Sequence, residues 1–232
     1  MNRPVAKAKR PSRAGAATRT QIMDVAEAII SEAGPDAVSV RDIASRAGVN
    51  LAAISYHFGS KENLFKEVVE RRILPLNAQR LDLLDRALEA APDARLHAIL
   101  NAFLAPLFHL AWDSQYKARV VVVSRFLNDA FSTPEGGRAV ISEYYEPVRR
   151  AFIRALHGCL PELPLDEVIW RYNSMVGVTL YSLGGIERLA AVPDQLADNA
   201  WPTGPENLAQ ALSRTIHFLE AGFRAPPTRG GS

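Results

Sequence analysis

The chain has 232 residues, 48% of them hydrophobic, and its net charge is only +2. This is ample apolar material for a buried core, in one large domain or two small ones. The single cysteine, Cys159, excludes an internal disulfide, no apolar signal segment starts the chain, and the longest apolar runs fall short of the roughly 18 to 20 residues that a membrane helix needs. We therefore expect a soluble, cytoplasmic protein with no role in a membrane.

The first residues carry charge of one sign. Every charged residue before Asp24 is basic: Arg3, Lys7, Lys9, Arg10, Arg13 and Arg19. Because this segment lacks apolar periodicity, we predict that residues 1–17 form a disordered basic arm. It is either a solvated tail or an arm that adds contacts to phosphates.

Three short helices are predicted next. From Thr20 onward, apolar residues recur at helical spacing, and the run ends at "AGPDA", residues 33–37. Ser39 is a suitable N-cap for a second helix of about two turns, which Gly48 ends. Asn50 can cap a third helix, which Gly59 ends, and Ser60 begins a fourth.

Two short helices joined by a turn that contains glycine form a helix-turn-helix, whose second helix enters the major groove of DNA. The small side chain of Ala52 allows a close approach to base edges, whereas Tyr56 and His57 have polar tips that reach further. Lys61 and the free amides at the start of the fourth helix suit phosphate oxygens. Phe58 has no polar atom and is predicted to fill the core of the three helices.

The stretch "SVRDIASRAGVNLAAISYHFGSKENLF" resembles the N-terminal domain of the tetracycline-repressor (TetR) family of bacterial transcriptional regulators. The most specific parts of the match are "YHF" at 56–58 and "SKENLF" at 60–65. By position, the resemblance implies contacts to DNA from these residues: Ser39, Val40, Arg41, Asn50, Leu51, Ala52, Ser55, Tyr56, His57 and Lys61. Leu51 and Ala52 replace a Lys or Gly that is frequent in the family, so the base preference of relatives does not transfer.

The rest of the chain is predicted to be helical, which makes the fold all-α. The expected helices are 61–90, 93–112, 115–131, 136–158, 165–191 and 205–223, with prolines at 75, 106 and 147 that bend three of them. We assign residues 18–62 to the DNA-binding domain, 63–225 to a helical domain and 226–232 to a disordered tail. Such bends favour a domain that wraps a cavity, although kinks without function are common.

The resemblance implies that this larger domain binds a ligand and forms a homodimer. The last two long helices are apolar enough to pair with those of a second subunit, or else they are buried within one subunit. "DEVIWRYNSMVG", residues 166–177, is similar to the eighth helix of a subgroup that includes regulators of fatty-acid metabolism, which suggests a hydrophobic or acyl-type effector. Candidate ligand contacts, each of which also suits the core or a salt bridge, are Leu104, Phe108, Arg119, Val122, Arg125, Phe126, Trp170, Arg171, Met175 and Tyr181.

The prediction is a homodimeric repressor that binds a palindromic DNA operator and is released by a small molecule, with no metal or cofactor. One alternative is a DNA-binding regulator without an effector. The other is an enzyme that uses Cys159 beside His157. Residues two apart on a helix face away from each other, and the five histidines show no paired spacing for a metal, so the sequence favours a regulator.

Overall fold

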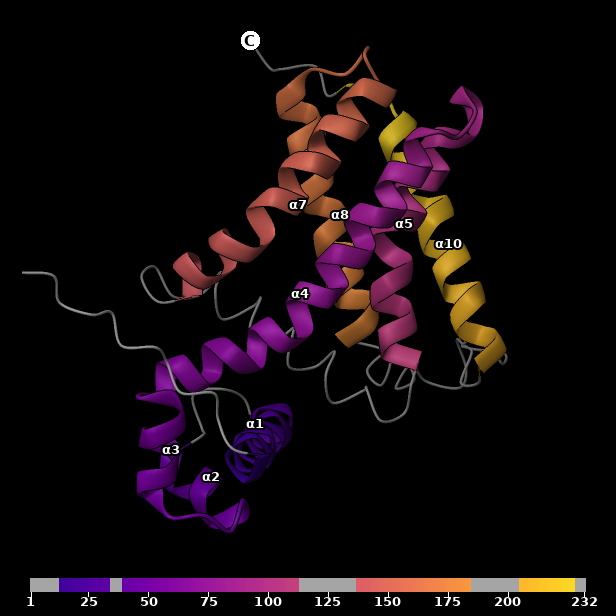
Figure 1. Ribbon diagram of the computed structural model, residues 1–232. Coiled ribbons are helices and arrows are strands. Elements are labelled where there is room, and N and C mark those ends of the chain that lie inside the picture. The colour runs from indigo at the N-terminus through magenta and orange to yellow at the C-terminus, as the bar shows by residue number, and fades with distance from the viewer. Residues whose placement is uncertain (1–12, 34–38, 113–136, 185–204, 228–232) are drawn as a thin grey trace, which may run out of the picture. The chain divides into compact units, whose positions relative to one another are not determined.

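The computed structural model describes residues 13–33, 39–112, 137–184 and 205–227, and this part of the chain forms eight α-helices and no strand (Figure 1). It divides into two compact units, Met1–Val68 and Val69–Ser232, whose boundary falls inside helix α4. The predicted all-α fold is confirmed. None of the helices in these ranges is long and apolar enough to cross a membrane. The helix predicted at 115–131 lies outside the described residues.

The first unit contains α1 (Arg13–Ala33), α2 (Val40–Arg46), α3 (Leu51–Phe58) and the first turns of α4 (Lys61–Leu88). Helix α2 packs against both α1 and α3. The buried apolar side chains of this unit are Ile22, Met23, Ala26, Ile29, Ile30, Ile43, Ala44, Ala47, Ile54, Phe58, Leu64 and Val68. Phe58 is therefore part of the core, as the sequence predicted.

Helix α1 begins at Arg13, earlier than the predicted start at Thr20, so residues 13–17 belong to a helix and not to the disordered arm. The sequence criterion was the spacing of apolar residues, which detects a buried face. Residues 13–19 read "RAGAATR", and alanine has the highest helix propensity of all residues, so this turn is helical without burying a face. Residues 1–12 lie outside the described part of the chain.

The connection between α2 and α3 has the predicted chemistry. The Ser39 hydroxyl accepts from the backbone N–H of Asp42 at 3.1 Å, and the Asp42 carboxylate accepts from the backbone N–H of Ser39, which completes a capping box. At the other end of α2, Gly48 has φ 61°, a left-handed conformation that glycine adopts without steric cost. The backbone N–H of Val49 donates to the Ala44 carbonyl at 3.0 Å, the bond that defines a Schellman turn.

The connection between α3 and α4 is equally local. Asn50 caps α3, and its side chain accepts from the backbone N–H of Ala53 at 2.7 Å. Gly59, with φ 76°, ends the helix. The Ser60 hydroxyl then accepts from the backbone N–H of Asn63 at 3.1 Å, and the Asn63 side chain donates back to the Phe58 carbonyl at 3.0 Å. The start of α4 is thereby fixed against the end of α3.

The second unit contains the remainder of α4 together with α5 (Pro92–Trp112), α7 (Gly137–Cys159), α8 (Leu165–Gly184) and α10 (Pro205–Arg224). Helix α5 contacts α7, α8 and α10, and α8 also contacts α7 and α10 (Figure 1). The Phe103 ring of α5 packs edge-on against Phe152 of α7 and Tyr172 of α8, with centroids 5.1 and 5.6 Å apart. Leu76, Leu84 and Ala87 bring α4 into the same core.

All three predicted prolines lie inside helices: Pro75 in α4, Pro106 in α5 and Pro147 in α7. A proline has no N–H and its ring displaces the preceding turn, so carbonyls near it need other donors. In α5 the Phe103 carbonyl accepts a hydrogen bond from Arg80 Nε at 2.9 Å. A side chain of α4 thus donates to a carbonyl in the turn of α5 that precedes Pro106.

Candidate nucleic-acid interface

The exposed face of α3 carries four of the ten predicted DNA contacts. Leu51, Ala52, Ser55 and Tyr56 are exposed, whereas Ile54 and Phe58 on the other side of the helix are buried. Leu51 and Ser55 are four positions apart, as are Ala52 and Tyr56, so each pair lies one above the other on a helix with 3.6 residues per turn. The fold uses one side of α3 and leaves the other open.

Tyr56 is the most exposed large side chain of this face, at 85%. Its ring meets that of His57 edge-on, with centroids 5.1 Å apart and planes at 77°. His57 is half-buried, which limits its freedom more than that of Tyr56. The pair therefore presents a free phenol beside an imidazole that is partly held by its neighbours.

Lys61 is the first residue of α4, where the backbone N–H groups of a helix are open to an anion. Its ammonium lies 5.1 Å from the centroid of the Phe65 ring, a cation–π contact that orients the side chain. The Ser60 cap and the Asn63 hydrogen bond hold the start of α4, so the backbone of Lys61 is fixed in position. Its position suits a contact to a phosphate of a DNA backbone that passes the end of α3.

The residues at the start of α2 are less uniform. Arg41 is exposed and Val40 is half-buried. The Ser39 hydroxyl already serves the capping box, since it accepts from the Asp42 amide and contacts the Asp42 carboxylate. Arg41 is thus the residue here with the reach to meet DNA, and Ser39 shapes the helix that carries it. The Asn50 side chain has a similar second role as the cap of α3.

Two residues that position this interface were missed by the sequence analysis. Arg19 forms an ion pair with Glu67, and its guanidinium lies 5.1 Å from the centroid of the Phe58 ring, so it connects α1 to α3 and α4. The Gln21 side chain donates to the Ala47 carbonyl at 2.9 Å, at the end of α2. Their partners are 48 and 26 residues away, and no local pattern marks such pairs.

Eight of the ten predicted ligand contacts fall into three groups. Leu104, Phe108 and Met175 are buried in the core of the second unit. Tyr181 is in the last turn of α8. Four further residues lie outside the described part of the chain: Arg119, Val122, Arg125 and Phe126.

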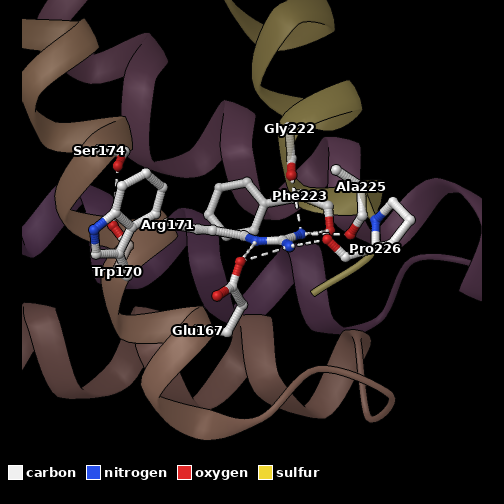
Figure 2. A network of polar contacts seen from close by, with 8 residues as sticks. All are labelled: Glu167, Trp170, Arg171, Ser174, Gly222, Phe223, Ala225 and Pro226. Carbon is white, nitrogen blue, oxygen red and sulfur yellow. Dashed lines mark hydrogen bonds and ion pairs between the residues drawn. The ribbon is translucent and has the colours of Figure 1, made fainter. Parts of the chain in front are cut away.

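Trp170 and Arg171 differ sharply although they are neighbours on α8. Trp170 is 66% exposed, whereas Arg171 is 7% exposed. The Arg171 guanidinium donates to the Glu167 carboxylate and to carbonyls at the end of α10 and just beyond it, at 2.8 to 3.0 Å: Gly222, Phe223, Ala225 and Pro226 (Figure 2). These carbonyls have no partner within α10, so Arg171 caps that helix. Its donors are occupied, and the fold accounts for this arginine without a ligand.

The described residues also bear on the enzyme alternative. Burial raises the pKa of the Cys159 thiol, which disfavours the thiolate that a nucleophile needs. Within the described ranges, no group of three or more His, Cys, Asp or Glu residues is arranged to hold a metal ion.

Comparisons with known proteins agree with this geometry. The family model of the bacterial regulatory proteins of the tetR family matches residues 22–68, and that of the tetracyclin repressor-like C-terminal domain matches residues 101–222. The transcriptional repressor KstR2 of Mycobacterium tuberculosis is 26% identical over 176 residues, which cover 72% of this chain and 82% of KstR2.

Solved structures show the same fold. The structure of the ketosteroid regulator KstR2 of Mycobacterium tuberculosis has a TM-score of 0.61 at 23% identity and covers 94% of this chain and 98% of that one. The structure of a SmeT–triclosan complex has a TM-score of 0.56 at 20% identity and covers 93% of this chain and 98% of that one.

Proposed function

Because this chain belongs to the tetR family of bacterial regulatory proteins, it is a DNA-binding transcriptional regulator, and we propose that it is a repressor that binds a palindromic operator as a homodimer. A small hydrophobic or acyl-type effector would release it from the operator. The site of action is the cytoplasm, where bacterial operators lie. The similarity to KstR2, which is named a transcriptional repressor, supports repression over activation.

The exposed face of α3 carries this proposal. Leu51, Ala52, Ser55 and Tyr56 take no part in the core, while Ile54 and Phe58 anchor the opposite face. A helix of eight residues that is anchored on one side and open on the other fits the width of the major groove. We propose that this face reads bases, and that Arg41, His57 and Lys61 contact the phosphates beside them.

Exposed aromatic side chains support a dimer through α8 and α10. Trp170 on α8 is 66% exposed and Phe218 on α10 is 65% exposed, although both are large and apolar. Side chains of this kind mark surfaces that another protein covers. A two-fold dimer would present two α3 helices, and operator reading requires that they lie about 34 to 36 Å apart, one turn of DNA.

The effector is supported by the second unit and by a relative. Leu104, Phe108 and Met175 supply an apolar interior, and the SmeT structure is a complex with triclosan. An effector that prefers one of two conformations shifts their populations and so lowers the operator affinity. A regulator without an effector predicts instead that no small molecule raises the melting temperature of the purified protein.

Selection of genomic fragments by the full-length protein tests the proposal, followed by fluorescence anisotropy with the recovered sequence. We expect a palindromic consensus and an affinity that falls steeply with salt. Lys61→Met should weaken binding to all sequences and reduce the salt slope by about one. Arg86→Met, at an exposed ion pair of α4, is the matched control and should leave the slope unchanged.

Two results would refute the proposal. One is that no fragment is enriched. The other is that Trp170→Glu with Phe218→Glu leaves both the dimer and the operator affinity intact in analytical ultracentrifugation and anisotropy. Leu88→Glu, at another exposed apolar residue, controls for the added charge.

A further inference from the structure

Arg80 of α4 is a buried cation with almost no partner. Its side chain is 2% exposed. Nε donates to the Phe103 carbonyl at 2.9 Å, and the guanidinium lies 4.0 Å from the centroid of the Phe103 ring. In the described ranges, the two terminal nitrogens of this guanidinium form no hydrogen bond or ion pair.

No carboxylate of the described residues neutralises Arg80. The titratable groups that face it are the phenols of Tyr145 and Tyr172, and burial raises the pKa of each to about 12, so both remain neutral at physiological pH. Burial lowers the pKa of Arg80, but a guanidinium in a protein stays protonated. The nearby Glu146 is held instead by Arg149 and Arg150, at 2.7 and 2.6 Å.

Two other buried polar atoms near Arg80 also lack a hydrogen bond. One is the Tyr145 hydroxyl, and the other is the Asn77 side-chain oxygen. Asn77 lies three residues before Arg80 and therefore on the same face of α4. Its side-chain nitrogen donates to the backbone carbonyl of Tyr144 at 2.9 Å, which joins this face of α4 to α7 beside Tyr145.

Apolar groups enclose this polar cluster. The Phe103 ring, which Arg80 contacts, packs against Phe152 and Tyr172, and all three are buried. A buried charge without a counter-ion destabilises the fold, and each unpaired polar group adds to that cost. Such a cluster makes physical sense where a second molecule supplies the missing partners, because strained and unpaired groups collect at functional sites.

We propose that Arg80, Tyr145 and Asn77 form the polar end of the effector site, and that the effector is an apolar molecule with one carboxylate. The carboxylate accepts from the terminal nitrogens of Arg80 and from the Tyr145 hydroxyl. The Asn77 oxygen accepts from a donor elsewhere on the ligand, and the aromatic side chains of α5, α7 and α8 hold the apolar body. This inference rests on the proposed function, since it defines the chemistry of the molecule that releases the operator.

The test compares acids with neutral partners of the same shape on the full-length protein. The probes are decanoate, 2-naphthoate and 1-adamantanecarboxylate, each paired with its primary amide, and the readouts are the melting temperature and isothermal titration calorimetry. We expect at least one acid to bind and its amide to bind about tenfold more weakly or not at all, since a charge-assisted bond is lost. Three acids that all fail to bind, or an acid and amide that bind alike, would overturn the inference.

Variants locate the binding. Arg80→Met should lower the affinity for the acid by about tenfold or more, because it removes a buried charge pair. Tyr145→Phe should weaken it by several-fold. The matched controls are Arg150→Met and Tyr144→Phe, whose polar groups already pair with Glu146 and Glu70, and both should stay within about twofold of the wild type.

Acid binding that survives Arg80→Met also overturns the inference. If circular dichroism shows that this variant is unfolded, Tyr145→Phe and Arg80→Lys decide, since lysine keeps the charge but loses the planar fork. Operator binding is measured on the same preparations. A wild type that binds its operator but no acid refutes only this inference, whereas one that selects no DNA refutes the proposed function.

Discussion

The turns around α3 in the first unit and the buried arginines of the second unit satisfy their polar groups over very different distances along the chain. In the first unit the turns around α3 are closed by Ser39, Asn50, Ser60 and Asn63, each of which bonds a group three to five residues away. In the second unit Arg80 reaches a carbonyl 23 residues away, and Arg171 reaches carbonyls 51 to 55 residues away. Local bonds therefore close the turns around α3, although Arg19 and Gln21 also bond across the first unit, whereas distant bonds hold the two buried arginines of the second unit.

This difference has an energetic consequence. A local cap contributes about 1 kcal/mol, and water replaces it readily when it is lost at the surface. A buried cation that holds a distant segment cannot be replaced by water, so its removal leaves several groups unpaired at once. Loss of a capping side chain should therefore be mild at the turns of the first unit, whereas loss of the buried arginine that caps α10 should be severe.

Arg171→Met should give the largest loss. The substitution removes the donors to the Gly222, Phe223, Ala225 and Pro226 carbonyls and leaves the partly buried Glu167 carboxylate unpaired. We expect the free energy of unfolding to fall by about 3 kcal/mol. Urea unfolding monitored by circular dichroism measures it. Arg86→Met, at an exposed pair with Asp82, is the control and should cost about 0.5 kcal/mol or less.

An equal cost at both arginines would break the comparison between buried and exposed pairs. The operator assay sharpens it further. If Arg171 acts only on the fold, a folded Arg171→Met protein should retain the base preference of the wild type.

Gly48→Val should give the second largest effect, a fall of about 2 kcal/mol in the free energy of unfolding. Gly48 has φ 61°, which a β-branched residue adopts at high steric cost, although nothing lies within 4 Å of an added Cβ. Gly158→Ala is the control, because that glycine is exposed in α7 and its added Cβ is equally free of contacts. Thermal unfolding should show a loss for the first substitution and none for the second. Similar losses would mean that the positive φ of Gly48 is not the cause of the loss.

The same contrast explains what the sequence could predict. Ser39, Gly48, Asn50 and Gly59 were assigned correctly because each residue type and its spacing fix a local geometry. The described helices of the second unit were also placed within a few residues, since apolar periodicity and proline positions are local signals. The predicted helix 115–131 and the predicted helix end at 191 lie outside the described residues.

What the sequence could not supply were pairs formed by folding. Arg19 was noted only as one of the basic residues before Asp24, yet it contacts Glu67 and Phe58. Arg171 was a candidate for an acidic ligand, yet it caps α10, and Arg80 was not considered at all. An arginine looks the same in sequence whether its partner is water, a carbonyl or a ligand, so only the tertiary structure separates these cases.

Asn50→Ala tests one of the smaller predicted losses of stability. The Asn50 side chain accepts from the Ala53 amide at 2.7 Å, and we expect its loss to cost about 1 kcal/mol. Asn50→Asp keeps the cap and should retain the stability, but it brings a negative charge to the DNA face. Operator affinity should therefore fall for Asn50→Asp while unfolding stays near that of the wild type. Equal affinities for both variants would place Asn50 away from phosphates.

The smallest effect concerns Glu146, whose pKa is lowered to about 2 by hydrogen bonds from Arg149 and Arg150. A carboxylate with a depressed pKa stabilises the fold above the pKa of its unfolded state, and this contribution is lost as the pH falls toward the folded value. Thermal unfolding of the wild type and of Glu146→Gln should therefore differ slightly near pH 6, and the two should converge as the pH falls from about 4.5 toward 2. The difference stays small because Arg150 is exposed and water screens the pair. If the difference in stability between wild type and Glu146→Gln grows on acidification, Glu146 is held by some other group. If that difference is as large as the one for Arg171→Met, local and distant pairs in the second unit contribute alike.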